Sequence, residues 1–79
     1  MRYEVVLPSL GDDAGDHATL SFWFIDAGAQ VKEGEDLVEM VTDKATFNVP
    51  CPRNGRVVEL KAKENQVVKV GEVMAVLEV

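Results

Sequence analysis

The sequence is poor in cysteine and in basic residues, two kinds of residue that often indicate a function directly. Only one of its 79 residues, Cys51, is a cysteine, so no internal disulfide can form. Lysine and arginine number 8 against 14 acidic residues and are spread singly along the chain, which argues against nucleic acid and anionic membranes as partners. The net charge of −6 favours a protein partner with a basic face.

Long hydrophobic runs are also missing. Apolar runs such as Phe22–Ile25 are far too short to cross a bilayer, and the N-terminus lacks the apolar region of a signal peptide. We therefore expect a cytoplasmic location, or the mitochondrial matrix if the protein is eukaryotic. The length predicts a single domain over residues 1–79, which we expect to be monomeric, and the hydrophobic share of 47% suits a globular fold.

The residues that are present predict β-structure. Apolar runs are short, rich in valine and separated by Gly, Pro, Asn and Asp, and no window shows an apolar stripe at helical spacing. We expect short additional strands around Val31 and Val67–Val68. The main expected strands are Tyr3–Leu7, Thr19–Ile25, Leu37–Thr42, Thr46–Val49, Val57–Lys61 and Val73–Val79.

The chain also contains an internal repeat. Val31–Leu37 recurs as Val68–Met74, with four of seven positions identical, and the same offset places Gly28 on Asn65, two residue types that tolerate a left-handed turn. A half of this size cannot bury its own apolar face. We therefore expect an all-β flattened barrel of two sheets with quasi-two-fold symmetry, a barrel-sandwich hybrid. A chance match is the alternative, because these residues are common.

The two halves differ most in one loop. The loop of the first half has nine residues, Ser9–His17, whereas the corresponding loop of the second half has only Cys51–Asn54. Acidic, glycine-rich insertions belong on the surface and often carry recognition. A solvated loop without a role is the other interpretation. The candidate partner-recognition residues are Gly11, Asp12, Asp13 and Asp16.

One lysine stands in a distinctive position. Asp43 and Lys44 separate two runs rich in β-branched residues, so the pair is expected to occupy the tip of a hairpin. A lysine at a tip can enter the active site of another enzyme, whereas a lysine lying flat on a sheet cannot. By itself, Lys44 would be taken for an ordinary exposed turn residue.

The surrounding pattern resembles the lipoyl domain family, found in acyltransferase subunits of 2-oxo acid dehydrogenase complexes. The resemblance covers essentially the whole chain. It is carried by Thr42-Asp43-Lys44-Ala45, Pro50-Cys51-Pro52, Gly55, the opening Leu7-Pro8-Ser9-Leu10-Gly11, and Trp23 five residues before Gly28. The chain departs from the family at Cys51, which we expect to be a small packing residue, and in its three adjacent aromatic residues, of which Phe22 is the candidate for exposure.

The resemblance implies a carrier rather than an enzyme. Lipoic acid would be joined to Lys44 as an amide, with Asp43 and Ala45 presenting the lysine and aiding ligase recognition. The arm would carry acyl groups and electrons between active sites. If the chain is part of a longer protein, that parent would be a dihydrolipoyllysine acyltransferase. The implied partners are a lipoate ligase or lipoyl transferase, a thiamine-dependent 2-oxo acid decarboxylase, the acyltransferase core and dihydrolipoamide dehydrogenase.

Three related alternatives are weighed against this interpretation. A biotin carboxyl carrier domain shares the fold, but its lysine stands between two methionines, whereas Lys44 lies between Asp43 and Ala45. The glycine-cleavage carrier protein is longer. An unmodified lipoyl-like barrel, acting as a structural or interaction module, would not need the Asp-Lys-Ala sequence.

Catalytic and metal sites find no support in the sequence. His17 is predicted to lie in a loop without a hydroxyl or thiol partner nearby in sequence, and Cys51 is expected to pack rather than react. Familiar metal and nucleotide motifs do not occur. We therefore predict neither catalytic residues nor metal ligands.

Overall fold

The computed structural model describes residues 1–11 and 15–79, which form eight strands. All the expected strands are present, and each end lies within two residues of the expected one. His17, expected in a loop, is instead the first residue of a strand, because it pairs with Lys69. The strands are β1 (Arg2–Val6), β2 (His17–Trp23), β3 (Gln30–Val31), β4 (Asp36–Val41), β5 (Thr46–Pro50), β6 (Gly55–Leu60), β7 (Val67–Lys69) and β8 (Val73–Glu78).

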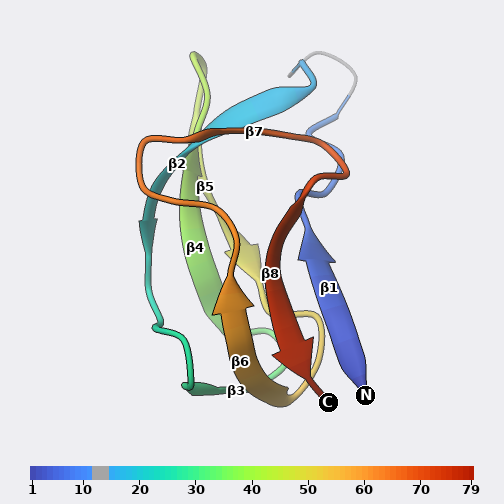
Figure 1. Ribbon diagram of the computed structural model, residues 1–79. Helices are drawn as coiled ribbons and strands as arrows, with labels where there is room; N and C mark the ends of the chain where they lie inside the picture. Colours follow the sequence, from blue (N-terminus) through green and yellow to red (C-terminus); the bar gives the residue numbers. More distant parts are fainter. Residues whose placement is uncertain (12–14) are drawn as a thin grey trace.

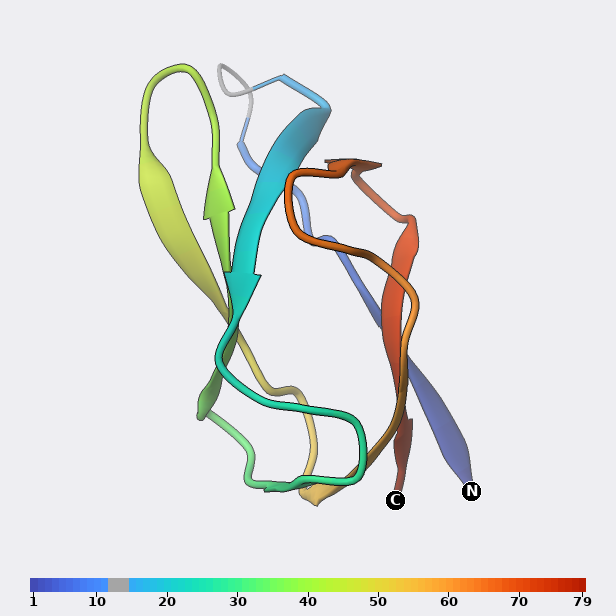
Figure 2. The same cartoon turned by 60° about the vertical axis from the view of Figure 1, so that its left-hand side comes forward.

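The strands form two four-stranded antiparallel sheets that face each other (Figures 1 and 2). One sheet has the order β1-β8-β6-β3 and is called sheet A; the other has the order β5-β4-β2-β7 and is called sheet B. The predicted two-sheet all-β fold is therefore confirmed. No helix among the described residues is long and apolar enough to cross a membrane.

The predicted quasi-two-fold symmetry is visible in the hydrogen bonds. The backbone N–H of Gly28 donates to the carbonyl of Val57 at 2.7 Å, and the N–H of Asn65 donates to that of Leu20 at the same distance. Gly28 and Asn65 have φ values of 93° and 70°, so both close the same left-handed turn. The repeat is therefore structural and not a chance match.

The two halves interlock instead of folding side by side. Strand β3 of the first half pairs with β6 of the second, and β7 of the second half pairs with β2 of the first. Each sheet thus contains strands of both halves. Neither half can therefore complete a sheet alone.

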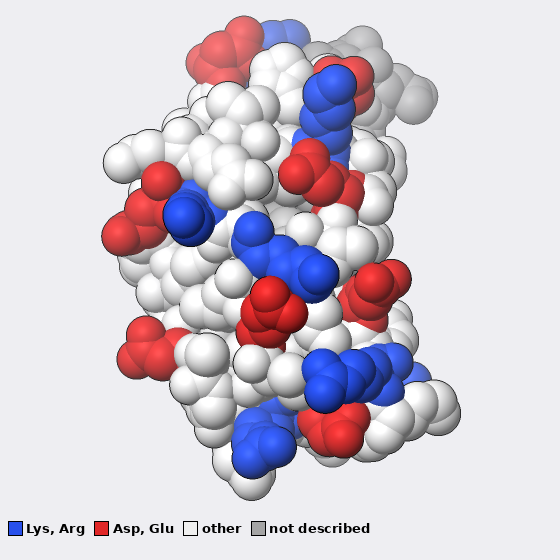
Figure 3. Space-filling model, in the orientation of Figure 1, with Lys and Arg blue, Asp and Glu red and all other residues white. Residues whose placement is uncertain are grey.

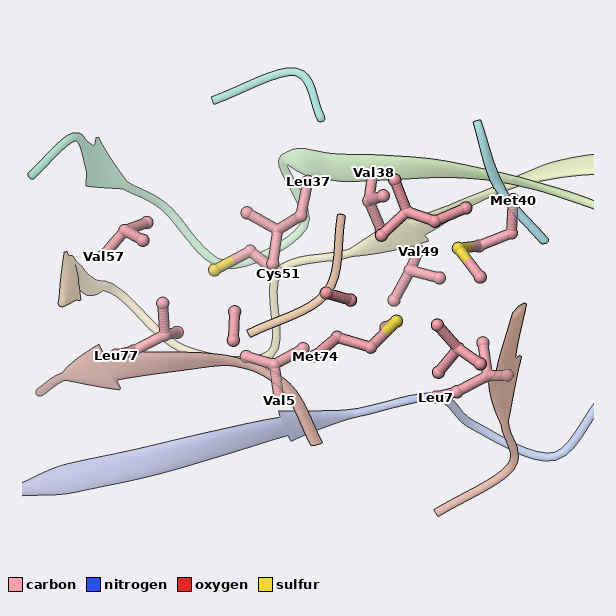
Figure 4. Close-up of a cluster of buried hydrophobic side chains, with 14 of the residues drawn as sticks. Val5, Leu7, Leu37, Val38, Met40, Val49, Cys51, Val57, Met74 and Leu77 are labelled. Carbon is pink, nitrogen blue, oxygen red and sulfur yellow. The ribbon is translucent and has the colours of Figure 1, made fainter. Parts of the chain in front are cut away.

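The core lies between the sheets and is entirely apolar among the described residues (Figure 4). Alternation sends one side chain in two inward along strands such as β2, whereas β8 buries four consecutive residues, Met74–Leu77. The largest fully buried side chains come from both sheets and from the turn after β1: Leu7, Leu20, Leu37, Met40, Met74 and Leu77. Trp23 packs against this core while its indole N–H donates to the carbonyl of Ala62 at 2.9 Å.

One glycine is required by close packing of the backbone. A Cβ added to Gly55 would lie 2.5 Å from the carbonyl oxygen of Glu78, nearer than real Cβ atoms approach. Gly55 begins β6 beside the end of β8, so only a residue without a side chain lets these strands meet. The glycine that follows the lysine motif in sequence is thus a packing residue.

The β4–β5 hairpin and the chain termini occupy equivalent places at opposite ends of the molecule (Figures 1 and 2). The N–H of Thr42 donates to the carbonyl of Ala45 at 2.8 Å, and the N–H of Val79 donates to that of Met1 at the same distance. The hairpin tip is therefore the connection that joins the two halves.

Candidate functional site

The candidate site is the tip of the β4–β5 hairpin. Asp43, Lys44 and Ala45 are exposed there, and Thr42 is half-buried. The tip lies beyond the last paired residues of the two strands, Val41 and Thr46. The expectation that Lys44 lies at a hairpin tip, outside the barrel core, is confirmed.

The Thr42 side chain organises the turn. Its hydroxyl oxygen accepts hydrogen bonds from the backbone N–H of Ala45 at 3.1 Å and of Lys44 at 3.3 Å. The same hydroxyl donates to the carbonyl of Ala45 at 3.2 Å. Threonine and serine at the start of a turn commonly bond the backbone two or three residues later. The sequence motif included Thr42 but did not reveal this role.

Two stretches of the chain flank the tip. Gly15, His17 and Thr19 border a hollow on one side of it, together with Val41 through Lys44. Ser9 and Leu10 border a second hollow, with Thr42, Ala45 and Phe47. The segment Ser9–His17, as far as it is described, thus lies beside the tip.

The predicted recognition residues are only partly visible. Gly11 is exposed with a φ of 97°, and Asp16 is exposed. Asp12 and Asp13 lie outside the described residues. The Asp16 carboxylate lies 3.0 Å from Nδ1 of His17, and this hydrogen bond lowers the pKa of Asp16. Both side chains are solvent-facing.

Cys51 behaves as a core residue. It is 2% exposed, its Sγ donates a hydrogen bond to the carbonyl of Arg53, and burial raises the pKa of its thiol. A buried thiol of raised pKa is a poor nucleophile. The interpretation of Cys51 as a packing residue is confirmed. No group of three or more acidic, histidine or cysteine side chains in the described part of the chain could hold a metal ion.

The chemistry available to this site is that of the Lys44 side-chain amine at the hairpin tip. The tip offers one exposed lysine on a short turn that is held by hydrogen bonds and extends from sheet B. Such an amine can enter a deep active site and accept an acyl group there. Its neighbours, Asp43 and Ala45, are short side chains that leave the approach open.

Comparison with known proteins agrees with this geometry. A family model described as biotin-requiring enzyme, the biotin and lipoyl family, matches residues 3–77. The chain is 38% identical over 78 residues to the dihydrolipoyllysine-residue succinyltransferase component of the 2-oxoglutarate dehydrogenase complex of Bartonella vinsonii subsp. berkhoffii. That match covers 99% of this chain but 19% of the relative, so the chain spans about a fifth of the relative's length.

Solved structures share the fold. The lipoyl domain of the 2-oxoglutarate dehydrogenase complex from Azotobacter vinelandii superposes with a TM-score of 0.76 at 23% identity, covering 98% of both chains. A single-chain, multi-domain long-chain acyl-CoA carboxylase superposes with a TM-score of 0.79 at 20% identity, covering 95% of this chain and 7% of that one. At these identities the likeness concerns the fold. The family model, in contrast, spans nearly the whole sequence, and the chain therefore belongs to the biotin and lipoyl family.

Proposed function

We propose that residues 1–79 form a lipoyl carrier domain in which Lys44 takes lipoic acid as an amide. The observation that carries this proposal is the Thr42-Asp43-Lys44-Ala45 tip, exposed and held outside the core of a lipoyl-type barrel. The 38% identity to a dihydrolipoyllysine-residue succinyltransferase component supports lipoyl over biotin. The domain serves a 2-oxo acid dehydrogenase complex as an arm, without an active site of its own.

The residues at the tip fit covalent attachment of this group. An amide requires a primary amine that reaches another enzyme's active site, and Lys44 is the only lysine in the turn. Once attached, lipoic acid supplies a dithiolane ring that carries acyl groups and electrons. The chain itself supplies the platform: Thr42 holds the turn, and the two sheets keep the tip at one end of the molecule.

The partners follow from this role. A lipoate ligase or lipoyl transferase modifies Lys44 and recognises Asp43 and Ala45. The modified arm visits a thiamine-dependent 2-oxo acid decarboxylase, an acyltransferase core and dihydrolipoamide dehydrogenase. Gly11, Asp12, Asp13 and Asp16 contribute to recognition of the decarboxylase. The proposed location is the cytoplasm, or the mitochondrial matrix in a eukaryote.

Biotin attachment is the second candidate function. The description of the family model and the structural likeness to a carboxylase favour it. The residues flanking the lysine do not, because Asp43 and Ala45 stand where biotin carriers have methionines. The mass of the modified protein distinguishes the two functions directly.

The test is intact-mass analysis of the domain after co-expression with a lipoate ligase and, separately, with a biotin ligase. We expect one lipoyl group on the wild type, mapped by peptide sequencing to Lys44, and none on Lys44→Gln. Lys32→Gln is the matched control, since Lys32 is another exposed lysine at the start of a turn. Lipoylation of Lys44→Gln, or modification of the wild type by biotin alone, would contradict the proposal.

A further inference from the structure

The outer faces of the two sheets differ in chemistry although the quasi-symmetry makes their positions equivalent. One cross-strand row of sheet A carries three charged residues and a glutamine. The corresponding row of sheet B carries none, because its positions hold threonine and valine. The sheet A row is Arg2, Glu78, Arg56 and Gln30, and the sheet B row is Thr46, Val41, Thr19 and Val67.

The next rows show the same contrast. In sheet A, Val76 lies between Glu4 and Glu59; in sheet B, Glu39 lies between Asn48 and Phe22. The following positions are Lys61 and Phe24, which are equivalent because their N–H groups donate to Met74 and Leu37, respectively. Two aromatic rings in sheet B therefore replace a glutamate and a lysine in sheet A.

These differences change what each face presents to water. Val76, the apolar residue in the middle of the sheet A face, is only 5% exposed. Figure 3 shows Lys and Arg side chains interspersed with Asp and Glu side chains on the face of the molecule seen in that view. Such a mixed charged surface is what a face in permanent contact with solvent carries.

On sheet B the apolar side chains remain open to solvent. Phe22 is 36%, Phe24 45% and Val67 54% exposed, and the two phenylalanine rings contact each other edge to face with centroids 4.7 Å apart. We call this surface the aromatic face; it consists of Thr19, Phe22, Phe24, Glu39, Val41 and Val67. Two exposed aromatic rings in contact, with exposed valines on the same outer face, form the kind of apolar surface that marks interaction sites.

The charge of the aromatic face selects the kind of partner. Strands β2, β4 and β5, which build most of it, contain no lysine or arginine, and their acidic residues are Asp36 and Glu39. We propose that the aromatic face docks a partner protein whose apolar contact patch is bordered by Lys or Arg. A second copy of the chain is disfavoured, because two molecules of charge −6 would bring their Glu39 carboxylates together. The proposal stands independently of any modification of Lys44.

Site-specific photo-crosslinking in the native host tests this docking. p-Benzoylphenylalanine is placed at Phe22 and, as a matched control, at the equivalent sheet A position Glu59. We expect one protein to crosslink from position 22 and not from position 59, and mass spectrometry to identify it. Absence of that crosslink, equal crosslinking from both positions, or crosslinking to a second copy of the chain would overturn the proposal.

Binding of the purified, identified partner then measures the contribution of the face. We expect Phe22→Thr with Phe24→Thr to weaken binding by about tenfold or more, because buried aromatic anchors dominate interfaces. Threonine keeps the strand preference, and the equivalent pair Glu59→Thr with Lys61→Thr should leave the affinity unchanged. Glu39→Gln should reduce the loss of affinity caused by added salt. Equal affinities in the two double variants would overturn the proposal.

Discussion

At the scale of single residues, Cys51 shows how position decides chemistry. A lone cysteine in a sequence is compatible with a nucleophile, a metal ligand or a packing atom. Here the side chain sits between the sheets at 2% exposure and donates to the carbonyl of Arg53. Its role is therefore to fill space in the core. Because the thiol is buried in the folded state, its ionisation is coupled to unfolding.

This position predicts a pH dependence of stability. Burial raises the pKa of the Cys51 thiol above its ordinary value, so the folded state keeps a proton that the unfolded state has lost at high pH. The stabilising contribution of Cys51 is fully present below the ordinary thiol pKa and declines as the pH rises toward the raised one. Urea unfolding at about pH 8 and about pH 10 measures this.

The matched variant is Cys51→Ala, which has no thiol to titrate. It should be less stable than the wild type by about 1 kcal/mol at the lower pH, and the gap should narrow at the higher pH. All other ionisable groups are the same in the two proteins, so their effects cancel in the difference. A gap that stays constant with pH would show that the thiol ionises equally in both states.

At the scale of elements, a single hydroxyl organises the tip of the β4–β5 hairpin. Thr42 bonds the backbone of Lys44 and Ala45, while the Thr42 N–H to Ala45 carbonyl bond closes the turn. The strands below the tip are held by the core. Changes in the tip should therefore alter how Lys44 is presented more than whether the barrel folds.

Thr42→Val tests this separation, since valine keeps the shape and removes the hydroxyl. We expect a loss of about 0.5–1.5 kcal/mol in stability, the usual net contribution of a hydrogen bond. Lipoylation should slow by roughly fivefold. Without the hydroxyl the ordered turn is less stable by about 1 kcal/mol, and the ligase must supply that free energy when it binds. Ligase kinetics and amide exchange at Ala45 measure the two effects.

Thr46→Val is the control for that experiment, since Thr46 is the first residue of β5 after the tip. It removes an exposed hydroxyl near the tip that takes no part in the turn bonds given above. Equal lipoylation rates for wild type and Thr42→Val would mean that the ligase orders the turn itself.

At the scale of the whole molecule, the quasi-two-fold symmetry relates the two ends of the barrel to each other. The termini meet where the hairpin tip would lie in the other half, and the Met1 amine also donates to the Val79 carbonyl at 3.1 Å. Because the halves interlock through β3 and β7, folding is expected to be cooperative over the whole chain.

A circular permutant tests whether the fold depends on the β4–β5 connection. A two-residue turn joins Val79 to Met1, and new termini are opened between Asp43 and Lys44. We expect it to keep the β-sheet circular dichroism spectrum and a single unfolding transition, since all eight strands and their partners are retained. Lipoylation should fall sharply, because the turn that presents the lysine is cut. An unfolded permutant would show that the β4–β5 connection is needed for folding.

Much of this fold was predictable from the sequence, because its signals are local. Valine-rich alternation indicated the strands, and the match of Val31–Leu37 to Val68–Met74 revealed the repeat. The same offset pairs Gly28 with Asn65, and both have the positive φ that few residue types adopt. The position of Lys44 between two strand-forming runs predicted the hairpin tip. Phe22 was expected to be exposed and is.

Other features arise only when the sheets assemble. The pairing of β3 with β6 joins segments remote in sequence, and nothing local in a two-residue strand selects its partner. The need for glycine at position 55 comes from the Glu78 carbonyl, and the Thr42 bonds come from the geometry of the closed turn. The exposure of Phe24 beside Phe22, and the contrast between the two outer faces, likewise depend on register.

Sequence alone thus determined the strand content and the candidate lysine, because each depends on residues within a few positions of one another. It also determined the repeat, because two segments can be compared residue by residue without knowing where they lie in the fold. Tertiary structure decided which half completes which sheet, where the tip lies relative to the chain ends, and which of two equivalent faces stays apolar. Those outcomes depend on contacts between distant residues, and such contacts exist only after both sheets close over the common core.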